Sequence, residues 1–379
     1  MLTRAWGGRL TGVALSAALL VAPGSAWPQA VRPIRIGQSA DFSGPQAASV
    51  NEATAAARAY FDSVNERGGV HGRRIVLESL DDGFEPQRTV ANARRLVAEH
   101  QVAALFLMRG TANAEALVPV LPELRVPMFA AVAGSRQLHE PADRLVFNLR
   151  PPYRTEVQRA IEQLATTGAR RIAVAYTDDP FGRDALEGAR AGLLRHRLEA
   201  AALVPMPRGA TDVAAPAEAL RKTDAEAVIG LCIPRTCAEL VRRLRELGST
   251  AQFVSLSNTA SASYVQQLGR HARGVIVSQV FPDPKSARSP LVEDYQKLAR
   301  ARGLAESYTS MEGYLAARVM VEALRRAGPA GGTDRLVAAF ESMRDFDLGG
   351  FHVSYGPGDR TASEFVELTM IGADGRFVR

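Results

Sequence analysis

The sequence is poor in the residues that metal sites and nucleophilic enzymes require. Only two of its 379 residues are cysteine and six are histidine, and no histidine has a second histidine or a cysteine at metal-ligand spacing. It also contains no Gly-x-Ser-x-Gly elbow, no P-loop and no Gly-x-Gly-x-x-Gly turn after a strand. Because no set of nucleophile, base and metal can be assembled, we expect a protein that is not an enzyme and has no cofactor.

Lysine and aromatic residues are scarce as well. Lysine occurs only at Lys222, Lys285 and Lys297, so arginine carries nearly all of the positive charge behind the formal net charge of +6. The arginines form no dense basic run, and the aromatic residues, 6% of the chain, do not interleave with them. The stacking platform of a single-strand binder is therefore absent, and we expect no nucleic acid partner.

Long apolar runs are missing except for one near the N-terminus. Arg4 and Arg9 precede residues 10–22, an apolar run that is too short to span a bilayer comfortably, and small residues follow it up to Ala26. Basic residues, a short apolar run and small residues form the pattern of a cleaved secretory signal. We expect cleavage after Ala26, with Ala30 as the alternative site, and a membrane-retained signal anchor stays open.

Removal of residues 1–26 would leave an exported, soluble chain, and no cysteine near the cleavage point could carry a lipid anchor. Cys232 and Cys237 would then lie in an oxidising compartment, where two thiols five positions apart favour a local disulfide more than a metal site. Against the bridge, Pro234 and a helix that begins near Thr236 would keep the two Cα atoms apart. The sequence leaves this pairing open.

Short apolar segments alternate with helical patterns along the remainder of the chain. In residues 34–74, a strand is followed by a Ser-Gly-Pro turn at 43–45 and by an alanine-rich helix that stops at Gly68 and Gly69. Residues 102–107 and 126–132 are continuous apolar runs, which are typical of strands buried on both faces. This alternation predicts an α/β fold with doubly wound parallel sheets.

Three breaks in the pattern divide the chain into two lobes. Prolines follow the predicted strands at residues 146–149 and 274–280, and Gly349 and Gly350 mark the third break. We expect three crossings between a first lobe, residues 31–148 plus 283–349, and a second lobe, residues 149–282 plus 350–379. After the last crossing, residues 351–354 and 365–371 are predicted to pair as a hairpin.

The predicted ligand site lies between the lobes. In open parallel sheets, ligands bind beyond the carboxyl ends of the strands. The loops at those ends would line the cleft, namely residues 41–45, 109–112, 132–135, 177–181, 232–235, 257–259 and 280–281.

Several motifs of the chain resemble those of one known family. They are the Ser-Gly-Pro turn at 43–45, residues 65–72 (NERGGVHG), Asp81 and Asp82 followed by Pro86, Asp179 with Phe181 and Gly182, and residues 356–360. In this order and spacing the chain, over residues 34–379, resembles the type I periplasmic binding proteins. The resemblance is strongest to the branched-chain amino-acid-binding group that feeds ABC importers.

The resemblance implies a two-lobed protein of the periplasm that acts as a monomer. Such a protein closes on a small organic ligand, amino-acid-like or a carboxylate, and delivers it to an ABC permease in the inner membrane. The alternative is a ligand-sensing receptor of the same fold that feeds a signalling system.

The resemblance also implies which residues contact the ligand. Thr111 matches a serine that holds the ligand carboxylate, Phe181 and Cys232 match two tyrosines, and the loop Val132, Ala133, Gly134 and Ser135 matches one that holds the amino acid. Ser257 falls where a glutamate pairs with the ligand ammonium. Because Ser257 carries no charge, a zwitterionic amino acid would bind poorly unless another carboxylate replaces that glutamate.

Three charged residues are candidates by position, and two of them have a second interpretation. Asp41, beside Phe42 and Ser43 after the first strand, would supply the missing carboxylate or cap a turn, and Glu312 is a more distant candidate. Arg109 would pair with a ligand carboxylate bidentately or lie solvated on the surface.

Overall fold

The computed structural model describes residues 1–3, 5, 7–8, 32–141, 143–286 and 288–379. The apolar run of the predicted signal peptide and the cleavage sites at Ala26 and Ala30 lie outside the described residues. Arg32–Arg379 forms one of the two units of the chain and contains all of the strands and helices that follow. Among the described helices, none is both long and apolar enough to cross a membrane.

The first sheet has five parallel strands in the order β2-β1-β3-β4-β5. They are β1 (Ile34–Ala40), β2 (Ile75–Asp81), β3 (Leu105–Phe106), β4 (Met128–Phe129) and β5 (Val146–Phe147). The chain leaves β1 toward β2 and then returns to the opposite side of β1, which makes the sheet doubly wound. The strands β3 and β4 are shorter than the apolar runs that predicted them, but their residues are buried as expected.

Helices from two distant parts of the chain cover this sheet. The helices α1 (Ala47–Glu66), α2 (Pro86–Ala98), α3 (Thr111–Leu117) and α4 (Leu121–Leu124) come from the first half of the chain. The helices α10 (Pro290–Arg302), α11 (Tyr308–Ala327) and α12 (Thr333–Glu341) come from its last third. Both sets share one core, in which Phe340 of α12 stacks on Phe147 of β5 with ring centroids 4.6 Å apart.

The helices α1 and α11 pack closely because a glycine lies at their crossing. A Cβ atom on Gly313 would overlap the backbone carbonyl of Ala53 in α1. The exchange Gly313→Ala is therefore expected to lower the free energy of unfolding by about 1–3 kcal/mol, since neither backbone can yield without moving a helix. Urea unfolding followed by circular dichroism measures this loss.

The matched control is Gly192→Ala, also within a helix. There the nearest atom to a new Cβ is the side-chain end of Ile161 at 3.0 Å, which can rotate, and alanine favours the helix by about 1 kcal/mol over glycine. Equal losses in the two variants would contradict the close crossing of α1 and α11.

The second sheet has seven strands in the order β14-β13-β10-β9-β8-β6-β7. Five of them are parallel, namely β6 (Ile172–Thr177), β7 (Ala200–Met206), β8 (Ala227–Leu231), β9 (Gln252–Ser255) and β10 (Ile276–Gln279). The strands β13 (Glu367–Ile371) and β14 (Phe377–Val378) add an antiparallel edge. The helices of this lobe are α5 (Tyr153–Thr166), α6 (Pro180–Arg195), α7 (Ala214–Arg221), α8 (Pro234–Glu246) and α9 (Ala262–Leu268).

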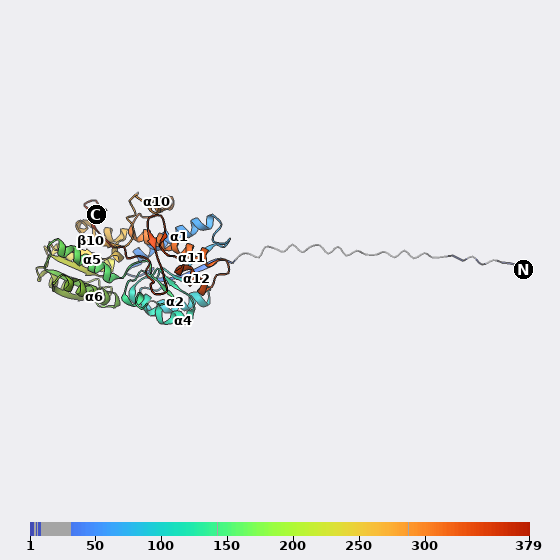
Figure 1. Ribbon diagram of the computed structural model, residues 1–379, viewed down its shortest axis with the longest axis horizontal. Coiled ribbons are helices and arrows are strands. Elements are labelled where there is room, and N and C mark those ends of the chain that lie inside the picture. The colour runs from blue at the N-terminus through green and yellow to red at the C-terminus, as the bar shows by residue number, and fades with distance from the viewer. Residues whose placement is uncertain (4, 6, 9–31, 142, 287) are drawn as a thin grey trace. The chain divides into compact units, whose positions relative to one another are not determined.

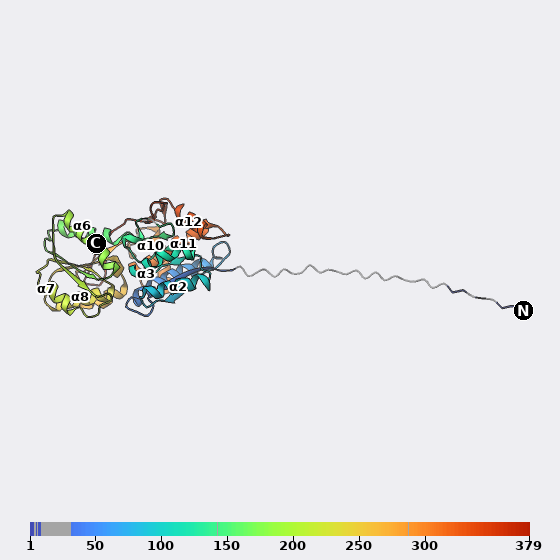
Figure 2. The same cartoon turned by 90° about the horizontal axis from the view of Figure 1, so that it is seen from below.

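The helices form two groups, and each group packs around one of the two sheets. In both Figure 1 and Figure 2, α6 lies apart from α2, α11 and α12, which gather around the first sheet. The predicted α/β fold with two doubly wound parallel sheets is confirmed.

The predicted C-terminal hairpin is wrong. The short strand β12 (His352–Val353) pairs with β11 (Phe346–Asp347), not with residues 365–371. The strand β13 instead pairs with β10. Gly349 and Gly350 have positive φ angles of 99° and 103° and form the turn between β11 and β12, where such angles favour glycine.

The residues after this turn still belong to the first sheet. Phe351, Tyr355 and Ala362 lie in its core, and Thr361 bridges to Asn148. Burial of the apolar side chains of this segment in that core stabilises the observed arrangement. The lobe boundaries remain predictions, and we propose that the third crossing follows Ala362.

Candidate functional site

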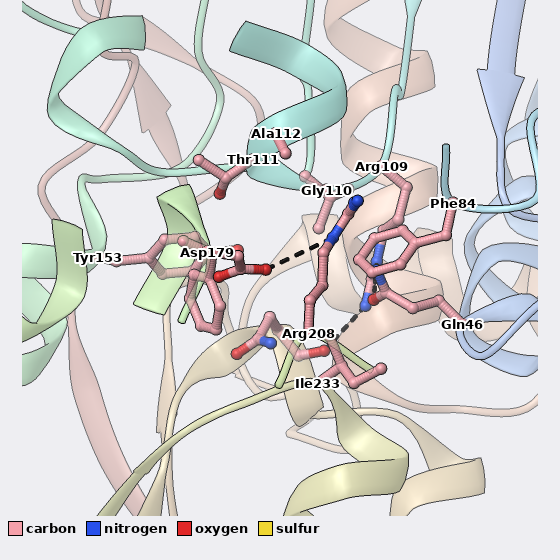
Figure 3. Close-up of a pocket in the computed structure, with 13 residues that line it drawn as sticks. Gln46, Phe84, Arg109, Gly110, Thr111, Ala112, Tyr153, Asp179, Arg208 and Ile233 are labelled. Atoms are coloured by element: carbon pink, nitrogen blue, oxygen red, sulfur yellow. Dashed lines mark hydrogen bonds and ion pairs between the residues drawn. The ribbon is translucent and has the colours of Figure 1, made fainter. Parts of the chain in front are cut away.

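A cavity lies between the carboxyl ends of the two sheets, where the sequence predicts the cleft (Figure 3). The first lobe contributes Gln46, Phe84, Arg109, Gly110, Thr111, Ala112 and Val132. The second contributes Tyr153, Asp179, Phe181, Arg208, Ile233 and Asn258. The cavity volume is about 20 Å³, which is room for about one water molecule, so the side chains of the two lobes nearly fill the cleft.

Arg109 is the most deeply buried cation of this cavity. It follows β3, its residue is 3% exposed, and its Nε donates to Oε1 of Gln46 at 3.0 Å. Its Nη2 donates across the cleft to the backbone oxygen of Asn258 at 2.9 Å, in the short helix η3 (Ser257–Thr259). Burial lowers the pKa of Arg109. The second interpretation of Arg109, a solvated surface residue, does not apply.

Arg208 spans the cleft from the other side. It lies in the turn after β7, and its guanidinium carbon is 3.9 Å from the centroid of the Phe84 ring. Its Nη2 donates to Oδ1 of Asn113 in the first lobe at 2.7 Å. Its Nε lies 3.5 Å from Oδ2 of Asp179, the interaction drawn as a dashed line in Figure 3. Arg208 therefore contacts both lobes.

Asp179 is the acidic residue that lines the cavity, and other groups already engage it. It caps α6 by accepting from the backbone N–H of Gly182 at 2.9 Å and from Oγ1 of Thr177 at 3.0 Å. Burial raises the pKa of this carboxyl, and these hydrogen bonds and Arg208 oppose the rise.

Aromatic rings form the apolar walls. Tyr153 and Phe181 meet edge to face with centroids 4.8 Å apart, and the Phe84 ring lies on the opposite side of Arg208 in Figure 3. The hydroxyl of Tyr153 accepts a hydrogen bond from Nη1 of Arg150 at 2.8 Å, so this ring is fixed from outside the cavity. The site thus combines guanidinium groups with apolar faces.

The opening loop does not reach the cavity. Asp41 is fully buried and accepts from the backbone N–H groups of Gly44 and Gln46 at 2.6 and 2.7 Å. Phe42 and Ser43 donate to the carboxylate of Asp81. Asp41 is therefore a turn cap, the second of its two interpretations, because its carboxylate oxygens accept hydrogen bonds from nearby backbone N–H groups.

Ser257 also lies outside the cavity, although its neighbour Asn258 lines it. Its backbone N–H and its hydroxyl both donate to Glu156 at 2.9 Å, and the hydroxyl accepts from Arg150 at 2.9 Å. Burial raises the pKa of Glu156. These internal partners use the hydrogen-bonding capacity of Ser257.

Of the remaining predicted residues, Thr111, Val132 and Phe181 line the cavity, whereas four others do not. Those four are Ala133, Gly134, Ser135 and Cys232. The backbone oxygen of Gly134 accepts from the N–H of Tyr153 at 2.8 Å. Cys232 forms a disulfide with Cys237 across Cα atoms 5.5 Å apart, and its neighbour Ile233 faces the cavity instead.

The prediction missed Gln46, Phe84, Tyr153 and Arg208. Phe84 follows β2 and Arg208 follows β7. The rule that ligands bind beyond the carboxyl ends of parallel strands would have included both residues if longer loops had been considered. Gln46 is one residue beyond the predicted opening loop. Tyr153 begins α5 after the first crossing, and no local signal marks it. Within the part of the chain that the structure describes, no cluster of acidic, histidine or cysteine side chains is placed to hold a metal ion.

Comparison with known proteins places the chain in one family. A family model described as periplasmic binding protein matches residues 33–376. A substrate-binding periplasmic protein from Ralstonia solanacearum shares 32% identity and a TM-score of 0.87, covering 91% of this chain and 99% of that one. A possible leucine/isoleucine/valine-binding protein from Rhodopirellula baltica shares 28% identity and a TM-score of 0.88, over 93% and 98% of the two chains.

A curated relative supports the same assignment. The Leu/Ile/Val-binding protein homolog 3 of Brucella melitensis is 24% identical over 315 residues, 82% of this chain and 83% of that protein. These matches confirm the resemblance to type I periplasmic binding proteins that the sequence motifs indicated. The chain belongs to the periplasmic binding protein family.

Proposed function

We propose that the protein is the solute-binding component of an ABC importer in the periplasm and captures a small organic ligand between its lobes. The observation that carries this proposal is the cavity at the carboxyl ends of both sheets, which side chains of both lobes line. The predicted signal peptide and the Leu/Ile/Val-binding relatives support it. The partners would be the ligand and a permease of the inner membrane.

Capture would proceed by closure of the lobes. Arg109 donates to Asn258 and Arg208 donates to Asn113, so hydrogen bonds already connect the lobes across the cleft. A cavity of about 20 Å³ leaves no room for an organic ligand to enter. The lobes would therefore separate first, and a ligand that contacts both would favour the closed form.

Isothermal titration with amino acids and with aliphatic and aromatic carboxylates tests this function. We expect one compound per chain to bind in the low micromolar range or tighter. If the free lobes separate in solution, small-angle scattering should show a smaller radius of gyration with ligand than without it. The variant Arg208→Gln should weaken this binding, because it removes a cation that contacts both lobes.

The control for this experiment is Arg183→Gln. Arg183 is an exposed residue of α6 whose partner is the exposed Asp178, so its replacement should leave affinity unchanged. Failure of every compound to bind, together with no small molecule in native mass spectra of the freshly purified protein, would refute the proposed function.

A further inference from the structure

Arg109 is a buried cation that no carboxylate of the described chain contacts directly, and the more distant Glu312 and Glu52 oppose the lowering of its pKa by burial. Within the described residues, no carboxylate oxygen lies within 4.0 Å of its guanidinium, whose two hydrogen bonds go to the neutral Gln46 and to a backbone oxygen. The other deeply buried cation nearby, Arg150, pairs with Glu312 at 3.2 Å. An unpaired buried charge costs several kcal/mol. The protein therefore keeps an energetically unfavourable charge at a position that faces the cavity.

The acidic groups around Arg109 are occupied elsewhere. Glu312 pairs with Arg150, and Glu52 accepts from the hydroxyl of Ser307 and the N–H of Ala262 without lining the cavity. Asp179 lines the cavity, but a helix end and Arg208 engage it. A ligand would therefore find in this cavity a guanidinium whose hydrogen bonds go to neutral groups, and no carboxylate without a partner.

Apolar side chains form much of the cavity wall around Arg109, beside the polar Gln46, Thr111 and Asn258. Phe84, Val132, Phe181 and Ile233 line the cavity, and Tyr153 adds a ring whose hydroxyl is already bonded to Arg150. Apolar surface of this kind stabilises a hydrocarbon body through burial, at about 25 cal/mol per Å². The two features together describe a ligand with one anionic end and an apolar remainder.

We propose that the cavity takes a monocarboxylate with an apolar body and no ammonium group, and that Arg109 binds its carboxylate. This inference rests on the proposed function and narrows it to one class of solute. A ligand carboxylate would pair with the guanidinium in two parallel hydrogen bonds. A zwitterionic amino acid of the same size would bury its ammonium without a carboxylate partner.

Pairs of ligands with one carbon skeleton test the inference on the unaltered protein. Isothermal titration would compare 4-methylpentanoate with leucine, and 3-phenylpropanoate with phenylalanine, at pH 7.5. We expect the acid of the preferred pair to bind at least about tenfold more tightly than its amino acid, because the ammonium has no anionic partner. Equal or tighter binding of the amino acid would overturn the inference and leave the proposed function standing.

Variants of Arg109 test its role. The exchange Arg109→Gln should weaken binding of the preferred acid by about 100-fold, as the loss of one partner of a buried charge pair does, while the affinity for its neutral amide changes far less. Arg109→Lys should retain part of the preference for the acid. The exposed Arg183→Gln is the control. Equal losses for acid and amide would overturn the role of Arg109.

The outcomes remain distinct even when a variant does not fold. The comparison of acid with amino acid uses only the unaltered protein and decides the inference by itself. If neither acids nor amino acids bind, this inference fails, and the proposed function fails as well when native mass spectra of the freshly purified protein show no bound small molecule.

Discussion

Replacement of Arg150 by methionine is expected to lower the free energy of unfolding by about 3–5 kcal/mol, because it leaves a buried charge without its partner. Arg150 is 1% exposed and pairs through Nε with Glu312 at 3.2 Å. Its two other nitrogens donate to Tyr153 and Ser257 at 2.8 and 2.9 Å. Guanidinium chloride unfolding at pH 7 measures the loss.

The double variant Arg150→Met with Glu312→Leu should recover a large part of that stability. In the double variant the carboxylate of Glu312 is removed together with the guanidinium of Arg150, so no buried charge of this pair is left without its partner. Double-mutant cycles give coupling energies of about 0.5–3 kcal/mol for groups in contact. The control is the exposed pair of Arg95 in α2 and Glu99, the residue after that helix, because loss of a surface ion pair costs only about 0–1 kcal/mol. Similar losses for Arg150→Met and Arg95→Met would contradict the role of the buried pair.

Acid is expected to destabilise the protein through His139. Burial, with a smaller contribution from Arg150, lowers the pKa of His139 from 6.5 to about 4. Its Nδ1 lies 2.8 Å from Oγ1 of Thr361, and its Nε2 is buried without a hydrogen-bond partner in the structure. The folded protein therefore holds the ring neutral at a pH at which the unfolded chain protonates it.

The sign of the effect follows from proton uptake. Between pH 6.5 and about 4, the unfolded state binds a proton at His139 and the folded state does not, so stability falls as the pH falls through this window. Above pH 6.5 the contribution is fully present. At 1.36 kcal/mol per unit of pKa, the total loss from this residue is about 3 kcal/mol.

Urea unfolding at intervals of pH between 7 and 4 measures this slope. The variant His139→Gln should lose about 3 kcal/mol less than the unaltered protein over that range, since glutamine does not titrate. The same exchange at His71, which is exposed, is the matched control. An unchanged slope in His139→Gln would show that other groups cause the acid sensitivity.

Local patterns in the sequence were sufficient to predict the class of fold. Apolar runs at residues 102–107 and 126–132 became buried parallel strands, and the alanine-rich segment that stops at Gly68 and Gly69 became the helix α1. Periodicity and turn residues are properties of neighbours in the chain, so a sequence shows them directly. The cleft between the carboxyl ends of the sheets follows from the same connectivity.

Such local patterns could not predict how the C-terminal segments pair with other strands. Residues 351–354 and 365–371 have equally strand-like sequences, and only their burial against different sheets separates them. The energy that decides between the two pairings comes from long-range contacts, such as the edge-to-face contact of Tyr355 with Phe147, whose ring centroids are 5.5 Å apart. A local pattern contains no information on those contacts.

Sequence by itself determined the α/β architecture, the two sheets and several of the loops that face the cleft, because these depend on local periodicity and on the order of elements. Only the tertiary structure decided which charged side chain enters the cavity. Asp41 and Arg109 both follow strands of the first sheet, yet Asp41 bonds to its own loop and Arg109 reaches Asn258, 149 positions away. Burial and charge pairing depend on residues that are distant in the chain, so only the folded protein fixes them.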